Sequence, residues 1–207
     1  MPLIIFEGLD KCGKSTHSKH LVDNLNKNGY KASLLRFPDR TTPSGMKCDE
    51  YLRGITKFDD LEINDIFAEN RAEKRDYIIK ALENDEYIIC DRYTLSGIAY
   101  SSSKGFDIKR CAAPDANTLL PDLIIYCHSE EHMTRQEFGD EIYEHAEAQQ
   151  RVQQQFEKLL KQLQGHVKIE YLNTDLAQSI NEERVLNLAK NTAKPSVYRS
   201  FSEVSIE

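Results

Sequence analysis

The chain has 207 residues, of which 40% are hydrophobic and 29% are charged, a composition typical of a folded, soluble globular protein. This length predicts a single domain over residues 1–207. The net charge is −7 and no long basic run occurs, so we expect no polymeric nucleic acid as a partner.

The apolar runs PLIIF and LIIY are too short to span a bilayer, and the N-terminal residues lack the pattern of a signal peptide. We therefore expect no membrane partner and a cytoplasmic location, with nuclear entry left open. The five cysteines show no C-x-x-C spacing, which predicts reduced, mostly buried thiols and neither a disulfide framework nor a thiolate zinc site.

Short, apolar segments predict five strands, which are LIIFEG from Leu3, KASLLRF from Lys31, YIICD from Tyr87, DLIIYCH from Asp122 and VKIEYLN from Val167. Such segments are typical of strands buried on both faces of a parallel sheet. Helices are expected between them at Lys14–Asn28, Leu61–Asn84, Ser96–Lys104 and Glu141–Leu163. This alternation predicts a doubly wound α/β domain, followed by a loosely held polar tail over residues 191–207.

The segment GLDKCGKS, residues 8–15, follows the first strand and matches the phosphate-binding pattern G-x-x-x-x-G-K-[ST]. Its glycines let consecutive N–H groups point inward, and the helix that follows adds partial positive charge. Lys14 is expected to reach the β- and γ-phosphates of a nucleoside triphosphate, and Ser15 to ligate Mg²⁺. The predicted site comprises Gly8, Leu9, Asp10, Lys11, Cys12, Gly13, Lys14, Ser15 and Thr16.

Two clusters predict where a second ligand binds, since an open α/β sheet gathers ligands at its strand ends. In RFPDRTTPSG the proline forces an extended or turning backbone that could aim Arg40 at an anion. In NDIFAENR one helical face carries Asn64, Phe67 and Arg71, where a ring and a forked donor suit a base. A solvated surface role for Arg40 and a core role for Phe67 stay open.

A third cluster, DRYTLSGIAY, begins directly after an apolar strand. Asp91 could hold a metal-bound water or orient an attacking oxygen, and Arg92 could neutralise a phosphoryl group in flight. The guanine-reading motif N-K-x-D does not occur, because NKNG at Asn26 lacks the acid, which argues against a GTPase. The chemistry predicted from these clusters is phosphoryl transfer.

In their order along nearly the whole chain, the segments FEGLDKCGKST, FPDRTT, NDIFAENR, DRYTLSGIAYSSSKG and EIYEHAEAQQRV resemble the thymidylate kinase family, most closely its eukaryotic and poxviral branch. The resemblance implies a P-loop nucleoside monophosphate kinase fold, a five-stranded parallel sheet with helices on both faces and a short lid over residues 129–142. It implies an ATP-dependent enzyme that converts dTMP to dTDP, with Mg²⁺ as cofactor, acting as a homodimer.

The resemblance also implies a role for each matching residue. Lys14, Asp91, Arg92 and Lys11 would serve catalysis, Ser15 and Asp91 would hold Mg²⁺ partly through water, and Arg135 would lie near the donor's adenine. The contacts to dTMP would come from Asp10, Arg40, Asn64, Phe67, Arg71, Arg92, Gly97, Tyr100 and Tyr143. Asp10 would accept a hydrogen bond from the 3′-hydroxyl of dTMP, with Lys11 offsetting its charge.

This chain departs from many eukaryotic members at Lys11, where they have arginine, and lysine lacks the forked contact. Its lid carries only Arg135 as a basic residue, unlike the bacterial subtype with catalytic lid arginines. Two alternatives stay open. A broader pyrimidine monophosphate or nucleoside kinase is one, although a nucleoside kinase needs no Arg40, and a nucleotide sensor without turnover is the other.

Two further features admit two interpretations each. Cys12 lies among inward-pointing N–H groups near two lysines, which would favour a reactive thiolate, or it is a passive small residue. HSEEH, His128 to His132, matches a zinc peptidase pattern, but His128 ends an apolar run, so we expect ordinary histidines.

Overall fold

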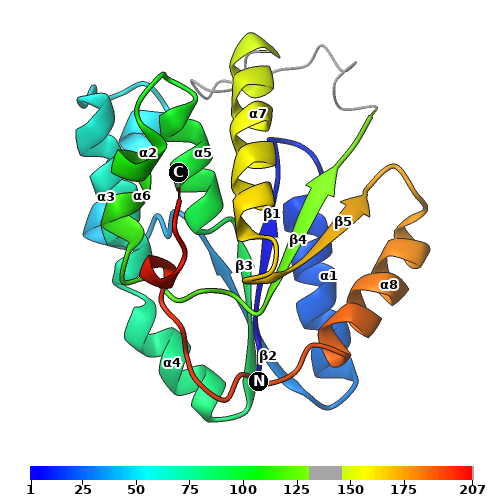
Figure 1. Ribbon diagram of the computed structural model, residues 1–207. Coiled ribbons are helices and arrows are strands. Elements are labelled where there is room, and N and C mark those ends of the chain that lie inside the picture. The colour runs from blue at the N-terminus through cyan, green and yellow to red at the C-terminus, as the bar shows by residue number, and fades with distance from the viewer. Residues whose placement is uncertain (131–145, 207) are drawn as a thin grey trace.

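A sheet of five parallel strands forms the centre of the molecule (Figure 1). The computed structural model describes residues 1–130 and 146–206. The strands follow the order β2-β3-β1-β4-β5 across the sheet, which puts β1 and its phosphate loop in the middle. All five predicted strands are confirmed, as β1 Leu3–Glu7, β2 Lys31–Arg36, β3 Glu86–Asp91, β4 Leu123–His128 and β5 Lys168–Asn173.

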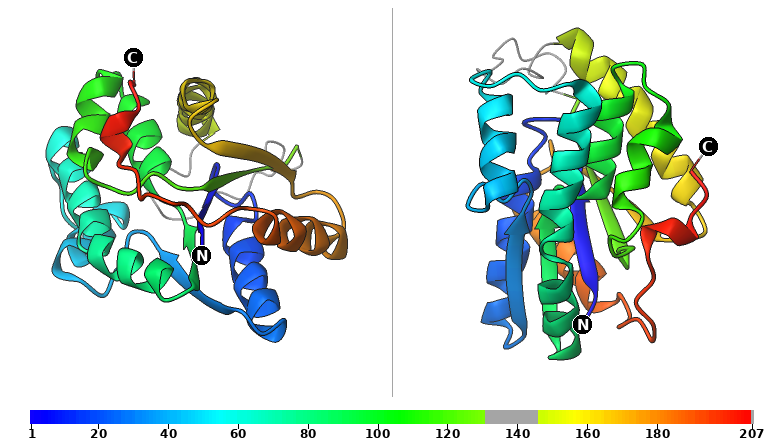
Figure 2. Two further views of the ribbon diagram at one scale, coloured as in Figure 1. Left: turned by 60° about the horizontal axis from the view of Figure 1, so that its bottom comes forward. Right: turned by 90° about the vertical axis from the view of Figure 1, so that its left-hand side faces the viewer.

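Helices cover both faces of this sheet, which confirms the predicted doubly wound P-loop kinase fold (Figure 2). One face is covered by α1 (Lys14–Lys27) and α8 (Gln178–Lys190). The other face is covered by α4 (Arg75–Glu83), α5 (Thr94–Ser102) and α7 (Ala146–Leu163). Beside α5 lie α3 (Asp60–Ala72) and α6 (Ile108–Ala112), and α2 (Pro43–Leu52) packs on α3. Within the described residues, every helix is too short or too polar to cross a bilayer.

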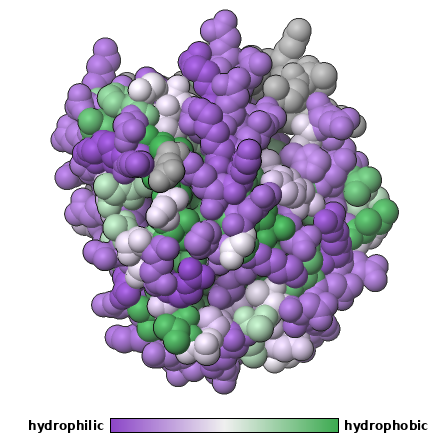
Figure 3. Space-filling model, viewed as in Figure 1, coloured by the Kyte–Doolittle hydropathy of each residue, from purple (hydrophilic) through white to green (hydrophobic). Residues whose placement is uncertain are grey.

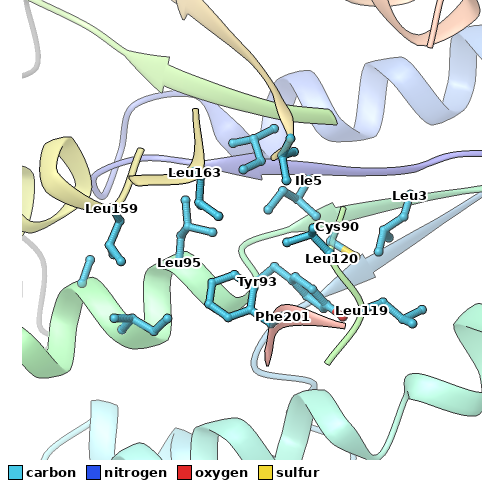
Figure 4. Close-up of a cluster of buried hydrophobic side chains, with 14 of the residues drawn as sticks. Leu3, Ile5, Cys90, Tyr93, Leu95, Leu119, Leu120, Leu159, Leu163 and Phe201 are labelled. Atoms are coloured by element: carbon cyan, nitrogen blue, oxygen red, sulfur yellow. The ribbon is translucent and has the colours of Figure 1, made fainter. Parts of the chain in front are cut away.

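The core has two halves because side chains alternate across a strand. In β1, Leu3 and Ile5 pack toward α4, α5 and α7, whereas Ile4 and Phe6 pack toward α1 and α8. All four are at most 1% exposed. Figure 4 shows the first half, where Leu3 and Ile5 meet side chains from β3, α5 and α7. Each such residue contributes about 1.5–3 kcal/mol of burial, so both halves hold the central strand in place.

The single helix predicted over Leu61–Asn84 is wrong, because the chain forms α3 and α4 with a break at Glu73 and Lys74. Neither glycine nor proline marks the break. On either side of it, Arg71 binds the Asp115 carboxylate and Arg75 Nε donates to the Asn117 carbonyl at 2.9 Å. Both arginines bind the same short loop, and this bends the segment. The helical periodicity of the sequence does not reveal such a tertiary contact.

Three helices escaped the sequence prediction, namely α2, α6 and α8. A start signal for α2 was present, since Thr42 accepts a hydrogen bond from the Gly45 N–H at 3.1 Å and Pro43 occupies the first helical position. For α8 the signal was the four-residue spacing of its buried Asn181, Val185 and Ala189. The predicted start at Glu141 lies outside the described residues.

The polar tail is not loosely held, and that prediction is wrong. Phe201, Val204 and Ile206 are buried and join the core half on the α4, α5 and α7 side. The Phe201 N–H donates to the Thr118 carbonyl at 2.9 Å, and Figure 4 shows the Phe201 ring beside Tyr93. These three isolated apolar residues in a polar stretch gave no periodic signal, although the fold buries all three.

We predict that Phe201→Ala lowers the free energy of unfolding by about 3–5 kcal/mol, because it leaves a cavity in the core. Val197→Ala, also in the tail but 71% exposed in the wild type, should change it by less than about 0.5 kcal/mol. Urea unfolding followed by circular dichroism measures both. Equal, small effects would mean that the tail does not contribute to the core.

Candidate active site

The loop between β1 and α1 is shaped by its two glycines. Gly8 has φ of 139°, and a Cβ there would lie 2.3 Å from the Cys127 carbonyl oxygen. Gly13 has φ of 82° and is the N-cap of α1, where no described side chain caps the first turn. The uncapped N–H groups and the helix dipole are the features that anion-binding loops share, and anion binding here stays a prediction from the pattern.

Lys14 lies inside the curl of the loop. Its side chain is buried, and its ammonium donates to the Leu9 carbonyl and lies 3.6 Å from Cys12 Sγ. Cys12 is itself 2% exposed and belongs to the core half under α1 and α8. This burial favours the interpretation of Cys12 as a passive small residue over a reactive thiolate.

The ends of β1 and β3 bring a hydroxyl and a carboxylate together. Ser15 Oγ donates to Asp91 Oδ2 at 2.5 Å, and Arg36 Nε donates to the same oxygen at 3.0 Å. Asp91 is 2% exposed and pairs with Phe6 in the sheet register. The predicted partners Ser15 and Asp91 therefore meet, as expected for the ends of adjacent parallel strands.

Asp10 is the centre of a hydrogen-bond network. Its carboxylate forms an ion pair with Arg92 and accepts hydrogen bonds from Tyr100 Oη at 2.6 Å and Gln149 Nε2 at 2.8 Å. Burial alone would raise the pKa of Asp10, but the positive charges of Arg92 and Lys14 lower it to about 2. Asp10 is therefore ionised at neutral pH. The sequence did not indicate Gln149, which comes from α7, 139 residues away.

Arg92 is held at both its backbone and its side chain. It has φ of 66°, and its N–H donates to the Phe6 carbonyl at 3.0 Å. Its Nη1 donates to Ser96 Oγ at 3.1 Å, and its guanidinium lies 5.4 Å from the centre of the Tyr100 ring. These contacts fix the direction in which the cation points.

Arg71 is buried and oriented by a carboxylate that the sequence analysis missed. Its Nε and Nη2 donate to the two oxygens of Asp115 at 2.7 and 2.6 Å, and both residues are at most 3% exposed. A Cβ at Gly97 would lie 2.5 Å from Arg71 Nη2, so the guanidinium lies against the backbone of α5. No motif marks Asp115, because it lies 44 residues away in a short 3-10 helix.

Three other residues predicted to bind substrate come from α3 and from the loop before α2, and the structure places them differently. Phe67 lines the cavity and is edge-on to Tyr51, with ring centres 6.5 Å apart. Arg40 also lines the cavity, where it pairs with Asp49. Asn64 does not reach it.

Asn64 was placed near the base by the sequence analysis, and the structure turns it elsewhere. It is fully buried, and its Nδ2 donates to the Cys111 carbonyl at 3.2 Å. The side chain turns toward α6, although the seven-residue spacing from Arg71 puts both residues on nearly the same helical face. Asn64 does not line the cavity, and its assignment near the base stays a prediction.

A cavity of about 440 Å³ joins the phosphate loop to the surroundings of Phe67 and Arg71. Among the described residues, two carboxylates, Asp10 and Asp91, and six cationic side chains line it, the cations being Lys11, Lys14, Arg36, Arg40, Arg71 and Arg92. Its lining also includes the predicted Gly13, Ser15, Thr16, Gly97 and Tyr100. This excess of positive charge in an acidic protein suits a polyanionic ligand.

Some predicted residues stand apart from the cavity. Gly8, Leu9 and Cys12 shape the loop from behind and do not line it. Arg135, Tyr143 and His132 lie outside the described residues. Among the residues that are described, no group of three or more His, Cys, Asp or Glu side chains could hold a metal ion by itself.

Comparisons with known proteins agree with this geometry. A family model described as thymidylate kinase matches residues 6–185. The thymidylate kinase of Schizosaccharomyces pombe is 37% identical over 193 residues, covering 91% of each chain, and that of Dictyostelium discoideum is 42% identical over 160 residues, covering 76% of this chain and 72% of the relative.

A solved structure shows the same similarity in three dimensions. The thymidylate kinase of Candida albicans superposes with a TM-score of 0.82 at 29% identity, covering 96% of this chain and 97% of that one. The phosphate loop, the strand order and these similarities together show that the chain belongs to the thymidylate kinase family.

Proposed function

We propose that the protein is a thymidylate kinase that transfers the γ-phosphoryl group of ATP to dTMP and releases dTDP and ADP. The carrying observation is the cavity that joins a phosphate loop at one end to an aromatic ring and a buried arginine at the other. Such a cavity has room for the phosphates of a donor and for a second, smaller nucleotide. Family membership supports the choice of reaction.

The donor phosphates would bind in the loop of residues 8–16. The uncapped first turn of α1 offers N–H groups, and Lys14 is already directed into the loop, where it would follow the β- and γ-phosphates. Arg135, outside the described residues, keeps its assignment near the adenine on the resemblance alone.

We propose Ser15 and Asp91 as the protein's contribution to a Mg²⁺ site. A hydroxyl and a carboxylate oxygen that lie side by side suit this hard cation, which typically takes one or two protein ligands together with waters and phosphates. Bound Mg²⁺ would offset phosphate charge. Arg36, which donates to the same carboxylate, would keep Asp91 oriented.

The acceptor would lie at the other end of the cavity. Arg40 would bind the dTMP phosphate and Phe67 would stack on thymine. Asp115 uses Nε and one N–H of Nη2 of Arg71, so the O4 atom of thymine would accept from one of the remaining N–H groups, of which Nη1 carries two. Tyr143, outside the described residues, keeps its assignment beside the deoxyribose on the resemblance.

Asp10 has capacity for one more hydrogen bond. A carboxylate offers roughly four acceptor sites, and three are used by Arg92, Tyr100 and Gln149. The remaining site would accept the 3′-hydroxyl of dTMP. The ion pair with Arg92 explains how a carboxylate can stand beside a phosphate site without repelling the ligand, and Arg92 and Lys11 would neutralise charge during transfer.

Assembly and organisation stay proposals based on the resemblance. We propose a homodimer through the helices near α3, where Met46 and Ile55 are 52% and 62% exposed. Figure 3 shows only small, separate apolar areas on a largely hydrophilic face. A single domain with a lid over residues 129–142, and a cytoplasmic location, likewise remain predictions from the sequence.

A coupled assay of ADP release tests the proposal. We expect turnover with dTMP and ATP, and none with thymidine, which lacks the phosphate that Arg40 would bind. The panel should include dUMP and dGMP, since broad substrate specificity has been described for the Candida albicans enzyme. Absence of turnover with every monophosphate in correctly folded protein would favour a nucleotide sensor instead.

We predict that Asp10→Asn reduces turnover at least about tenfold, because it weakens a charge-assisted contact worth roughly 1.5–3 kcal/mol and the hold on Arg92. The preference for dTMP over its 3′-deoxy analogue should largely disappear. Tyr100→Phe removes one hydrogen bond but leaves the carboxylate, so this control should retain the preference. An Asp10→Asn variant that discriminates like the wild type would remove Asp10 from the acceptor site.

We predict that Gly97→Ala raises the Michaelis constant for dTMP roughly tenfold and leaves that for ATP unchanged. The added Cβ would meet the Arg71 guanidinium at 2.5 Å and displace Nη1 from thymine, at a loss of about 1–3 kcal/mol. This change is cleaner than Arg71→Ala, which strands the buried Asp115 charge. Steady-state kinetics separate the two constants, and a change confined to ATP would place Arg71 elsewhere.

A further inference from the structure

The buried carboxylate of Glu7 has no part in the site described above. Glu7 is the last residue of β1, directly before the phosphate loop, and it is 0% exposed. It does not line the cavity. A carboxylate in the interior is strongly unfavourable unless its oxygens are bound by donors, so its partners indicate why it is there.

All the partners of Glu7 belong to the first turn of α5. Its Oε1 accepts from the backbone N–H groups of Tyr93 at 2.9 Å and Ser96 at 3.1 Å, and its Oε2 accepts from Ser96 Oγ at 2.5 Å. The N-cap residue Tyr93 supplies no side-chain cap of its own. Glu7 therefore caps α5 from the neighbouring strand, where a negative charge also opposes the helix dipole.

The same hydroxyl connects Glu7 to Arg92. Ser96 Oγ donates to Glu7, so its lone pairs are available to the Arg92 guanidinium, whose Nη1 donates to it at 3.1 Å. Arg92 has φ of 66°, a conformation uncommon for a residue with a side chain, and the next N–H along the chain is the one that Glu7 binds. Glu7 thus constrains the backbone beside Arg92 and, through one hydroxyl, its side chain.

We propose that Glu7 is a positioning residue that holds Arg92 in place for phosphoryl transfer, acting through Ser96 and the first turn of α5 without touching either nucleotide. The inference rests on the proposed function, which gives Arg92 its role. Because all three partners donate, the ionised carboxylate is the form that fits. Burial raises the pKa of Glu7 above its ordinary value, and the hydrogen bonds from Ser96 and the charge of Arg92 offset only part of this effect.

The substitution Glu7→Gln tests this role with little change in shape. Its amide oxygen can still cap the two N–H groups, but its NH₂ would point a donor at Ser96 Oγ, which already accepts from Arg92. We expect kcat with ATP and dTMP to fall at least about tenfold while both Michaelis constants change less than about twofold. A merely structural role would lower the thermal stability without this separation of kcat from the Michaelis constants.

Ser96→Ala provides the second variant, since it removes the hydroxyl and keeps the backbone N–H that Glu7 binds. If the hydroxyl carries the coupling, the Glu7→Gln and Ser96→Ala double variant should be no worse than about twofold below the slower single variant. Ser102→Ala is the matched control on the same helix. Its buried hydroxyl donates to the carbonyls of Ile98 and Ala99 at 2.7 and 3.4 Å, so near wild-type kinetics are expected.

Fully active Glu7→Gln protein, or losses that multiply in the double variant, would overturn the inference. If Glu7→Gln fails to fold, the kinetics of Ser96→Ala test the inference by themselves. A wild-type kcat in Ser96→Ala would then count against the coupling. If wild-type protein does not phosphorylate dTMP, the proposed function fails, and a crystal structure of Glu7→Gln then decides separately. An Arg92 guanidinium unmoved from Asp10 and Ser96 would overturn the positioning role.

Discussion

The ion pair between Asp10 and Arg92 is the contact on which the arrangement of the site depends. Asp10 belongs to the phosphate loop after β1, and Arg92 follows β3, so their contact ties together the ends of two adjacent strands. Without the carboxylate, Arg92 would face five other cations around the same cavity. Without the arginine, the charge of Asp10 would oppose any phosphate in the loop. Each charge neutralises the other, and the register of the parallel strands sets the distance between them.

The sequence predicted the structure correctly wherever a local pattern of residues determines it. The alternation of short apolar runs predicted all five strands, and the glycine-rich pattern placed the phosphate loop between β1 and α1. Helix boundaries were weaker, because the break between α3 and α4 comes from docking on the 115–117 loop and leaves no glycine or proline in the chain.

The residues that orient the site, which the sequence analysis missed, were missed for one physical reason. Asp115, Gln149 and Glu7 act on their targets from 44, 139 and 89 residues away, and no local spacing encodes such pairings. The family resemblance carried over the residues expected at the ligands and not those that orient them. Asn64 shares a helical face with Arg71, yet its side chain donates to the Cys111 carbonyl of α6, a tertiary contact that helical spacing does not reveal.

The arginines of the cavity divide by how firmly an aspartate holds them. Arg40 pairs with Asp49 from a side chain that is 46% exposed, and ion pairs at such surfaces contribute only about 0–1 kcal/mol, whereas Arg36 pairs with the buried Asp91. Arg40 can therefore turn to a phosphate at a small cost in stability. The Arg71 pair with Asp115 is buried, and separating a buried pair typically costs about 3–5 kcal/mol. Arg71 would therefore meet a base from a fixed position, with the N–H groups that Asp115 leaves on Nη1 and Nη2, while the more exposed Arg40 can adapt to the phosphate.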